Sequence, residues 1–134
     1  MTSFPLKIVT PDGLIFDGPA EKLIVRTTSG DIAILARHTN YVAPLGMGKA
    51  IVEHNGERRT AACIGGMLSV VDGTVTLVPT TFEWADKIDA ARAEASCERA
   101  NKVLNSKDAS ETDLKLAEAR LRRALVRKSV ASNR

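Results

Sequence analysis

Residues 85–134 read ADKIDAARAEASCERANKVLNSKDASETDLKLAEARLRRALVRKSVASNR, fifty consecutive residues that include neither glycine nor proline. All nine glycines and all five prolines of the 134-residue chain lie before residue 80. Because glycine and proline mark turns and interrupt helices, their joint absence predicts long uninterrupted helix in this stretch. Their density upstream predicts short strands joined by tight turns. The sequence therefore divides into a β-rich part, residues 1–84, and a helical part, residues 85–134.

The helical part predicts two helices that form an antiparallel hairpin, with a break near residues 105–108. Asp86 is the expected N-cap of the first helix, and Ser110 with Asp113 forms a capping-box pattern for the second. At 100° per residue each helix carries one narrow, alanine-rich stripe: Ala93, Cys97, Ala100 and Leu104 on the first, and Leu114, Ala117, Leu121, Ala124 and Leu125 on the second. Stripes of small side chains bury little apolar area, so we expect this hairpin to be marginal by itself.

The β-rich part alternates short apolar runs with turn residues. Asn55-Gly56 and Asp72-Gly73 each stand between two such runs, which is the strongest short-range signal for a β-hairpin. Thr10-Pro11-Asp12-Gly13 predicts another tight turn. The expected fold class is therefore β + α: an N-terminal antiparallel β-sandwich followed by a C-terminal antiparallel two-helix hairpin.

The net charge of +3 is unevenly placed. Residues 1–84 carry seven basic and eight acidic side chains, whereas residues 85–134 carry twelve and eight. From Arg120 onward there are six basic residues and no acidic one. A basic C-terminal helix favours an acidic partner, which leaves a protein, a nucleic acid and an anionic lipid surface open.

The cysteines and the lengths of the apolar runs indicate the cellular compartment. Cys63 and Cys97 fit no CxxC pattern, and we expect both to be buried free thiols in a reducing compartment. The N-terminus lacks the pattern of a signal peptide, and nowhere do about 18 apolar residues run together. These observations predict an intracellular protein that does not span the membrane.

Few residues of the β-rich part could carry catalysis. Cys63 and His38 are a conceivable nucleophile and base for a small hydrolase. However, Cys63 precedes Gly65-Gly66 in an apolar strand, where a small core thiol is the simpler interpretation. The sequence contains no spacing of metal ligands, no carboxylate cluster and no phosphate-binding loop. We therefore expect neither a catalytic nor a metal site.

Arginines of both predicted helices could converge if the hairpin closes. Arg92 and Arg99 share one stripe of the first helix with Ile88. On the second helix, Arg122 flanks the apolar stripe on one side, and Arg120, Arg123 and Arg127 lie towards the other. Arginine forks hold phosphate oxygens well. The alternative interpretation is a local pairing of Asp89 with Arg92 at the start of the helix.

Three segments carry a resemblance to a known family. Gly30-Asp31-Ile32-Ala33-Ile34-Leu35-Ala36-Arg37-His38 is similar to Gly-x-Leu-Gly-Ile-x-x-x-His, although Ala33 and Arg37 stand where glycine is usual. Gly65-Gly66-Met67-Leu68-Ser69-Val70 is similar to a Gly-Gly strand, and Ile88-Asp89-Ala90-Ala91-Arg92-Ala93 matches Ile/Leu-Asp-x-x-Arg-Ala. In this order and spacing, the whole chain resembles the epsilon subunit of bacterial rotary F-type ATP synthases.

The resemblance implies a non-catalytic central-stalk subunit at the cytoplasmic face of the bacterial cell membrane, peripheral to it. The sandwich would bind the gamma subunit and the ring of c subunits during proton-driven ATP synthesis, with Asp31 and His38 at the contact. The helical hairpin would permit turnover when folded and block ATP hydrolysis when extended into the alpha/beta headpiece. Arg120, Arg123, Arg127 and Lys128 would suit an acidic loop of the beta subunit.

The resemblance also implies that ATP can hold the hairpin folded, as a regulatory ligand rather than a required cofactor. The residues that it assigns to the nucleotide are Glu83, Ile88, Asp89, Arg92, Ala93, Arg99 and Arg122. A further arginine of the second helix is displaced, since Val126 precedes Arg127.

The main alternative is a β-sandwich adaptor whose basic helix binds nucleic acid or another acidic partner. No aromatic side chain interleaves the arginines, and Phe82 and Trp84 lie outside that helix. Because single-strand binding uses aromatic platforms, we expect no nucleic-acid partner.

Overall fold

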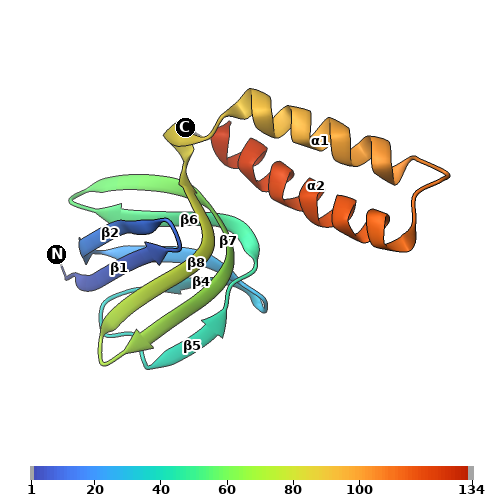
Figure 1. Ribbon diagram of the computed structural model, residues 1–134. Helices are drawn as coiled ribbons and strands as arrows, with labels where there is room; N and C mark the ends of the chain where they lie inside the picture. Colours follow the sequence, from blue (N-terminus) through green and yellow to red (C-terminus); the bar gives the residue numbers. More distant parts are fainter. Residues whose placement is uncertain (1, 133–134) are drawn as a thin grey trace. The chain divides into compact units, whose positions relative to one another are not determined.

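Two compact units make up the chain in the computed structural model, which describes residues 2–132. One unit ends at Trp84 and the other begins at Ala85. Strands form the first unit and helices the second (Figure 1). The predicted fold class, a β-sandwich followed by a helical hairpin, is confirmed.

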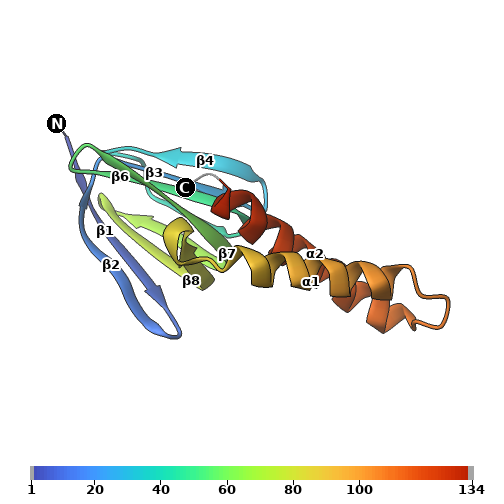
Figure 2. The same ribbon diagram turned by 90° about the horizontal axis from the view of Figure 1, so that it is seen from above.

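The sandwich contains eight strands in the path β2-β1-β8-β7-β6-β3-β4, with β5 paired to β7. Their bounds are β1 Phe4–Thr10, β2 Gly13–Ala20, β3 Lys22–Thr27, β4 Gly30–Ile34, β5 Tyr41–Pro44, β6 Met47–His54, β7 Glu57–Val71 and β8 Thr74–Trp84. Neighbouring strands are antiparallel except β1 and β8, which run parallel. Figure 2 shows β1 and β2 apart from β3 and β4.

Strand β7 connects the layers because it changes partner half-way along. Its first half pairs with β6 as far as Met47↔Ile64, and its second half pairs with β5 from Pro44↔Met67 onward. Between them, Gly65 and Gly66 have φ of 68° and 98°, a region that glycine enters without steric cost. The resulting bend carries the strand from one layer to the other.

The core follows from the period-2 alternation of the strands. In β1, for example, Phe4, Leu6 and Ile8 are buried while Pro5 and Lys7 are exposed. The largest fully buried side chains are aliphatic: Leu6, Ile8, Leu23, Val25, Ile34, Val52, Leu68, Val70, Val75 and Leu77. Each contributes roughly 1.5–3 kcal/mol by leaving water, so this unit has a substantial core without many aromatic residues.

Both predicted β-hairpins are present. Asn55 and Gly56 have φ of 52° and 75°, and Asp72 and Gly73 have φ of 50° and 82°. Two successive positive φ values define the type I′ turn, whose twist matches that of the flanking strands.

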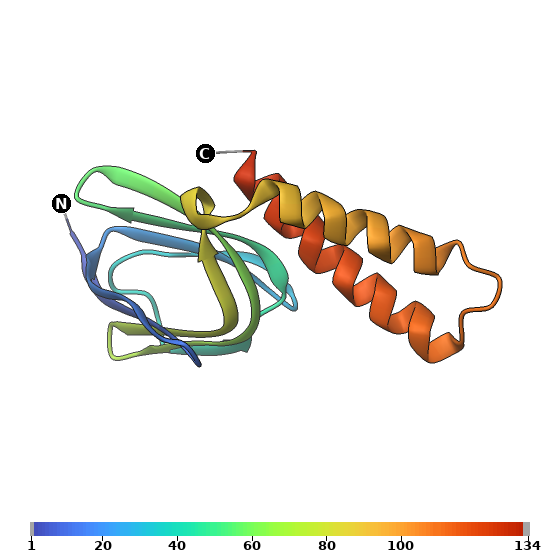
Figure 3. The ribbon, with the colours of Figure 1, turned by 45° about the horizontal axis from the view of Figure 1, so that its top comes forward.

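The helical unit contains a 3₁₀ turn, η1 (Ala85–Lys87), and the helices α1 (Ala90–Leu104) and α2 (Glu111–Ala131), which run side by side in Figure 3. The N-cap of α1 is Asp89, whose Oδ1 accepts the Arg92 backbone N–H at 3.0 Å. The prediction of Asp86 was wrong, because that residue lies in η1. The capping box of α2 is confirmed: Ser110 Oγ accepts the Asp113 N–H at 3.1 Å, and Asp113 Oδ2 accepts the Ser110 N–H at 3.3 Å.

The seam between α1 and α2 consists of small side chains. Ala93, Cys97 and Ala100 of α1 and Ala117 and Ala124 of α2 are buried. Leu125, which was predicted to belong to the stripe, is 48% exposed because its position is rotated away from the centre of the seam. The seam is therefore narrower and poorer in apolar area than the sequence suggests.

None of the helices among residues 2–132 is long and apolar enough to cross a membrane.

Gly66→Ala should destabilise the sandwich strongly. A Cβ at this position would lie 2.0 Å from the Val78 carbonyl oxygen, in addition to the strain of a positive φ. We expect the free energy of unfolding to fall by about 3 kcal/mol. At Gly73, which also has a positive φ but no atom within 4 Å of such a Cβ, the same substitution should cost only about 1 kcal/mol. Urea unfolding of both variants measures the difference, and equal losses would contradict the packing argument.

Candidate anion-binding groove

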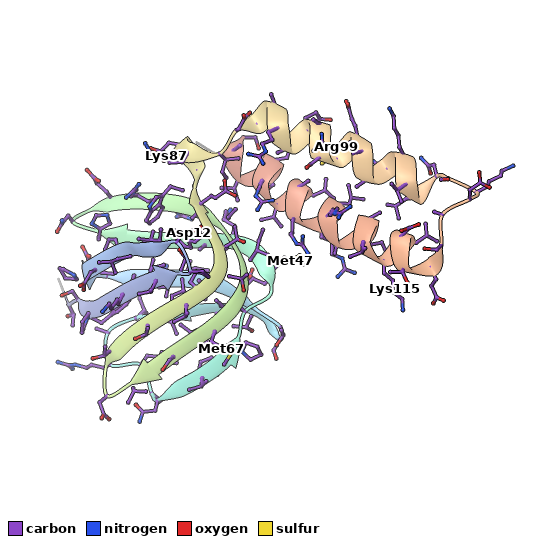
Figure 4. All side chains as sticks on the ribbon, in the orientation of Figure 1. Asp12, Met47, Met67, Lys87, Arg99 and Lys115 are labelled. Carbon is purple, nitrogen blue, oxygen red and sulfur yellow. The ribbon has the colours of Figure 1, made fainter. Side chains whose placement is uncertain are left out.

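The two helices leave a pocket of about 780 Å³ along one side of the hairpin. Its lining is formed by Ser96, Arg99, Ala100 and Val103 of α1, Ser106, Asp108 and Ala109 of the connecting loop, and Asp113, Leu116, Ala117, Arg120, Arg123 and Arg127 of α2. Figure 4 labels Arg99 on α1. The volume falls within the range of about 300–1,000 Å³ of small-molecule sites. We call this pocket the arginine groove.

Helical spacing brings the arginines together. Arg120, Arg123 and Arg127 are three and four residues apart, so they follow one face of α2. The register of the antiparallel pair is given by Lys128 Nζ, which lies 2.6 Å from Glu94 Oε2 on α1. Five residues along each helix from that pair, Arg99 and Arg123 lie at the same level of the hairpin, and both line the pocket.

Three arginines of the groove, Arg99, Arg120 and Arg123, have no ion-pair partner among residues 2–132. Arg99 Nη2 donates a hydrogen bond to Ser96 Oγ at 3.2 Å. The two carboxylates of the lining, Asp108 and Asp113, lie towards the connecting loop, and Asp113 caps α2. Guanidinium groups gathered without an acidic partner favour a bound anion, and their fork geometry suits phosphate or carboxylate oxygens.

The residues assigned to a nucleotide by resemblance are not all placed together. Arg99 lines the groove, whereas Ile88 and Ala93 are buried and the Asp89 carboxylate caps α1. Arg92 is exposed near the start of α1, and Glu83 lies on β8 in the other unit.

Arg122 does not belong to the groove lining, although Arg123 does. Successive residues of a helix project about 100° apart, so Arg122 points to a different side of α2. The sequence analysis assigned Arg122 to the nucleotide and Arg123 to an acidic protein partner. Helical angles group Arg123 with Arg120 and Arg127. Which side of α2 borders the groove, however, depends on how the two helices pack, and the sequence does not show that.

The basic residues expected to meet an acidic partner separate into two groups. Arg120, Arg123 and Arg127 line the groove. Lys128 instead pairs with Glu94, whose hydrogen bond and negative charge raise the pKa of the Lys128 ammonium. In the closed hairpin this lysine is therefore already engaged.

Asp31, predicted to contact a partner, is paired with Arg26 on the neighbouring strand. Arg26 Nε lies 2.9 Å from Asp31 Oδ1, and Nη2 lies 3.3 Å from Oδ2. This hydrogen bonding lowers the pKa of the exposed Asp31 carboxyl. The Arg26 side chain lies over Gly48, where an added Cβ would come within 2.8 Å of the Arg26 Cβ. The surface here presents a neutral ion pair rather than a lone carboxylate.

His38, the other predicted contact residue of the sandwich, follows β4. Its Nδ1 lies 2.8 Å from the Thr39 carbonyl oxygen, to which a protonated Nδ1 donates, and its ring meets Tyr41 edge-on at 6.0 Å. The preceding Arg37 has φ of 67°, which explains why glycine suits that position in the family that the chain resembles.

An exposed apolar patch on β5, β7 and β8 was not predicted. Val42, Met67 and Val78 are 62%, 43% and 45% exposed, and Met67 pairs in register with both Pro44 and Val78. Figure 4 labels Met67 on this sheet. Contiguous exposed apolar side chains indicate a protein-contact surface. Alternation along each strand, read together with the strand order, could have revealed it.

Cys63 has the environment of a core thiol. It is buried in β7, and this burial raises the pKa of its thiol to about 12. The thiolate, the nucleophilic form, is therefore suppressed near neutral pH. Among residues 2–132 no group of three or more His, Cys, Asp and Glu side chains could hold a metal ion.

Comparisons with known proteins agree along the whole chain. Residues 3–85 match the family "ATP synthase, Delta/Epsilon chain, beta-sandwich domain", and residues 86–132 match "ATP synthase, Delta/Epsilon chain, long alpha-helix domain". The ATP synthase epsilon chain of Ruminococcus albus is 42% identical over 135 residues, covering 100% of both chains. That of Bacillus velezensis is 41% identical over 133 residues, covering 99% of this chain and 100% of the relative.

Solved structures share the fold. A chain of the mitochondrial ATP synthase of Euglena gracilis (OSCP/F1/c-ring) superposes with a TM-score of 0.85 at 23% identity, covering 100% of this chain and 83% of that one. A chain of the Tetrahymena thermophila mitochondrial ATP synthase (central stalk/c-ring) gives 0.63 at 14% identity, with 95% of each chain covered.

Cys63 should resist thiol reagents in the native protein. With a pKa of about 12, about one Cys63 side chain in ten thousand is a thiolate at pH 8. We expect no labelling by Ellman's reagent in a Cys97→Ala variant until denaturant is added, followed by one equivalent. Rapid native labelling would show that the site is open and would revive a nucleophilic role.

Proposed function

The chain belongs to the delta/epsilon family of ATP synthase chains, and we propose that it is a non-catalytic central-stalk subunit of the rotor. In this role it links gamma to the membrane c ring during proton-driven ATP synthesis. It is peripheral to the membrane, at the cytoplasmic face of a bacterial cell, and held there through the complex. The 42% identity to an epsilon chain over the full length of both supports this assignment.

The sandwich is proposed to supply the permanent contacts. The exposed apolar side chains Val42, Met67 and Val78 suit burial against a protein surface. The Arg26–Asp31 pair and His38 add polar groups that fix orientation more than they add affinity. Gamma and the c subunits are the proposed partners of these surfaces.

The arginine groove is the feature that best supports a regulatory role for the helices. Guanidinium groups that line one groove repel one another, so a phosphate chain bound there would stabilise the closed hairpin. We propose ATP as this ligand, with its phosphates on Arg99, Arg123 and Arg127 rather than on Arg122. Ile88, Asp89, Arg92, Ala93 and Glu83 remain proposed contacts for the rest of the nucleotide.

An open hairpin offers the same arginines to a different anion. Once α1 and α2 separate, Arg120, Arg123, Arg127 and Lys128 are available to an acidic loop of the beta subunit in the alpha/beta headpiece. Because the alanine seam is narrow, separating the two helices costs little free energy, as a two-state element requires. Docking in this state is proposed to block ATP hydrolysis.

Addition of the chain to an F-type ATP synthase from which the epsilon subunit has been removed should lower ATP hydrolysis. Substituting Arg120, Arg123 and Arg127 together by alanine should restore hydrolysis several-fold, because the acidic partner loses its charge contacts. Lys102→Ala removes a basic residue of α1 outside the groove and serves as the control. Equal inhibition by the native chain and the triple variant would refute the proposed inhibitory contact.

Isothermal titration tests the nucleotide. Arg123→Ala should weaken ATP binding roughly tenfold, as the loss of one charged hydrogen-bond donor implies. Arg122→Ala should change it much less. If Arg122→Ala has the larger effect, the phosphates lie on the other side of α2; absence of binding by the native chain at millimolar ATP would remove ATP from the proposal.

A further inference from the structure

We propose that Asn40 is a positioning residue, which ties the loop that carries His38 to the turn between β7 and β8. The loop, residues 35–40, connects β4 to β5, and the turn is Asp72-Gly73. The inference rests on the proposed docking of the sandwich and identifies what holds His38 in place for its partner.

Asn40 is the last residue before β5, and its side chain reaches the turn. Asn40 Oδ1 accepts the backbone N–H of Asp72 at 2.8 Å, a bond between residues 32 positions apart in the sequence. The backbone pairing of β5 with β7 ends at Tyr41↔Val70. The side-chain bond therefore continues this attachment beyond the sheet and into the turn.

The turn leaves the Asp72 N–H free to make this bond. In a two-residue hairpin the ladder bonds join the residues that flank the turn, here Val71 and Thr74. The N–H of Asp72, the first turn residue, has no place in that ladder. An acceptor from another segment can take it without disturbing the sheet, and Asn40 supplies that acceptor.

The contacts around His38 inside the loop are local. The His38 backbone N–H donates to the Leu35 carbonyl oxygen at 3.3 Å, and the His38 ring meets that of Tyr41 edge-on. Arg37 has φ of 67°, a conformation that costs free energy for a residue with a Cβ. Local contacts of this kind give the loop its shape, but they do not hold it against the turn. The bond from Asn40 does.

This bond matters because both segments carry side chains suited to a protein contact. Leu35 of the loop and Val71 beside the turn are 54% and 50% exposed, and His38 is partly exposed. A partner that buries side chains of both segments loses less conformational entropy if their spacing is set beforehand. Asn40 thus contributes to docking by preorganisation rather than by a contact of its own.

Amide hydrogen exchange in the isolated chain tests the bond itself. Asn40→Ala removes the acceptor, so the Asp72 N–H should exchange several-fold faster than in the native chain. Because Asn40 and Asp72 are both exposed, the midpoint of urea unfolding should hardly change. The double variant Asn40→Asp/Asp72→Asn keeps an acceptor at position 40, a turn-forming residue at position 72 and the net charge, so it should restore slow exchange.

Binding to an F-type ATP synthase from which the epsilon subunit has been removed tests the positioning role. Asn40→Ala should raise the dissociation constant roughly three- to tenfold, and the double variant should return it to within about twofold of the native value. Asn101→Ala removes an exposed amide side chain from α1 and is the matched control, which should bind as the native chain does.

The outcomes separate this inference from the proposed function. If Asn40→Ala and the double variant weaken binding equally, the Asn40 amide contacts the partner directly and the positioning role is refuted. Native affinity of Asn40→Ala, or equally fast exchange of the Asp72 N–H in the native chain, would also overturn it and leave the proposed function intact. If the native chain does not bind the depleted complex, the proposed function fails and the positioning role fails with it.

Discussion

The small side chains buried along the seam of α1 and α2 determine what the helical unit can do. Ala93, Ala100, Ala117 and Ala124 are buried there. Side chains this small let two helices approach closely, and the approach places arginines of both helices around one groove. The same small side chains contribute little on leaving water, so the closed arrangement is weakly held. The small side chains thus cause both the close approach and the weak closure. A ligand in the groove can therefore shift the equilibrium between the open and the closed hairpin.

The two units are stabilised in different ways. The sandwich buries Leu, Ile and Val side chains on every central strand, and the bend of β7 at Gly65-Gly66 joins its layers. The hairpin relies on local devices: the Asp89 cap, the Ser110–Asp113 capping box and the Glu94–Lys128 pair. Each of these contributes about 1 kcal/mol or less. This difference favours a sandwich that stays folded and a helical hairpin that can open and close.

Local signals in the sequence predicted local structure well. Asn55-Gly56 and Asp72-Gly73 formed the expected hairpins, and the fold class followed from glycine and proline placement. The sequence did not reveal the parallel pairing of β1 with β8, because no short-range pattern encodes strand order. Asp86 and Asp89 are equally good caps by residue type, and the 3₁₀ turn decided between them. In the groove, helical angles grouped Arg120, Arg123 and Arg127, but only the packing of α1 on α2 brings them into one pocket with Arg99.

Cys97 makes the closed hairpin sensitive to the chemistry of its surroundings. Its thiol is buried in the seam, where the neighbouring side chains are small and close. Oxidation to a sulfenic or sulfinic acid would add oxygen atoms that this narrow contact has no room for and no hydrogen-bond partners to satisfy. The opening proposed above would expose the thiol to such damage, and a chain oxidised at Cys97 would close less tightly. Oxidation as far as the sulfinic acid, which is essentially irreversible, would then accumulate molecules in the open form.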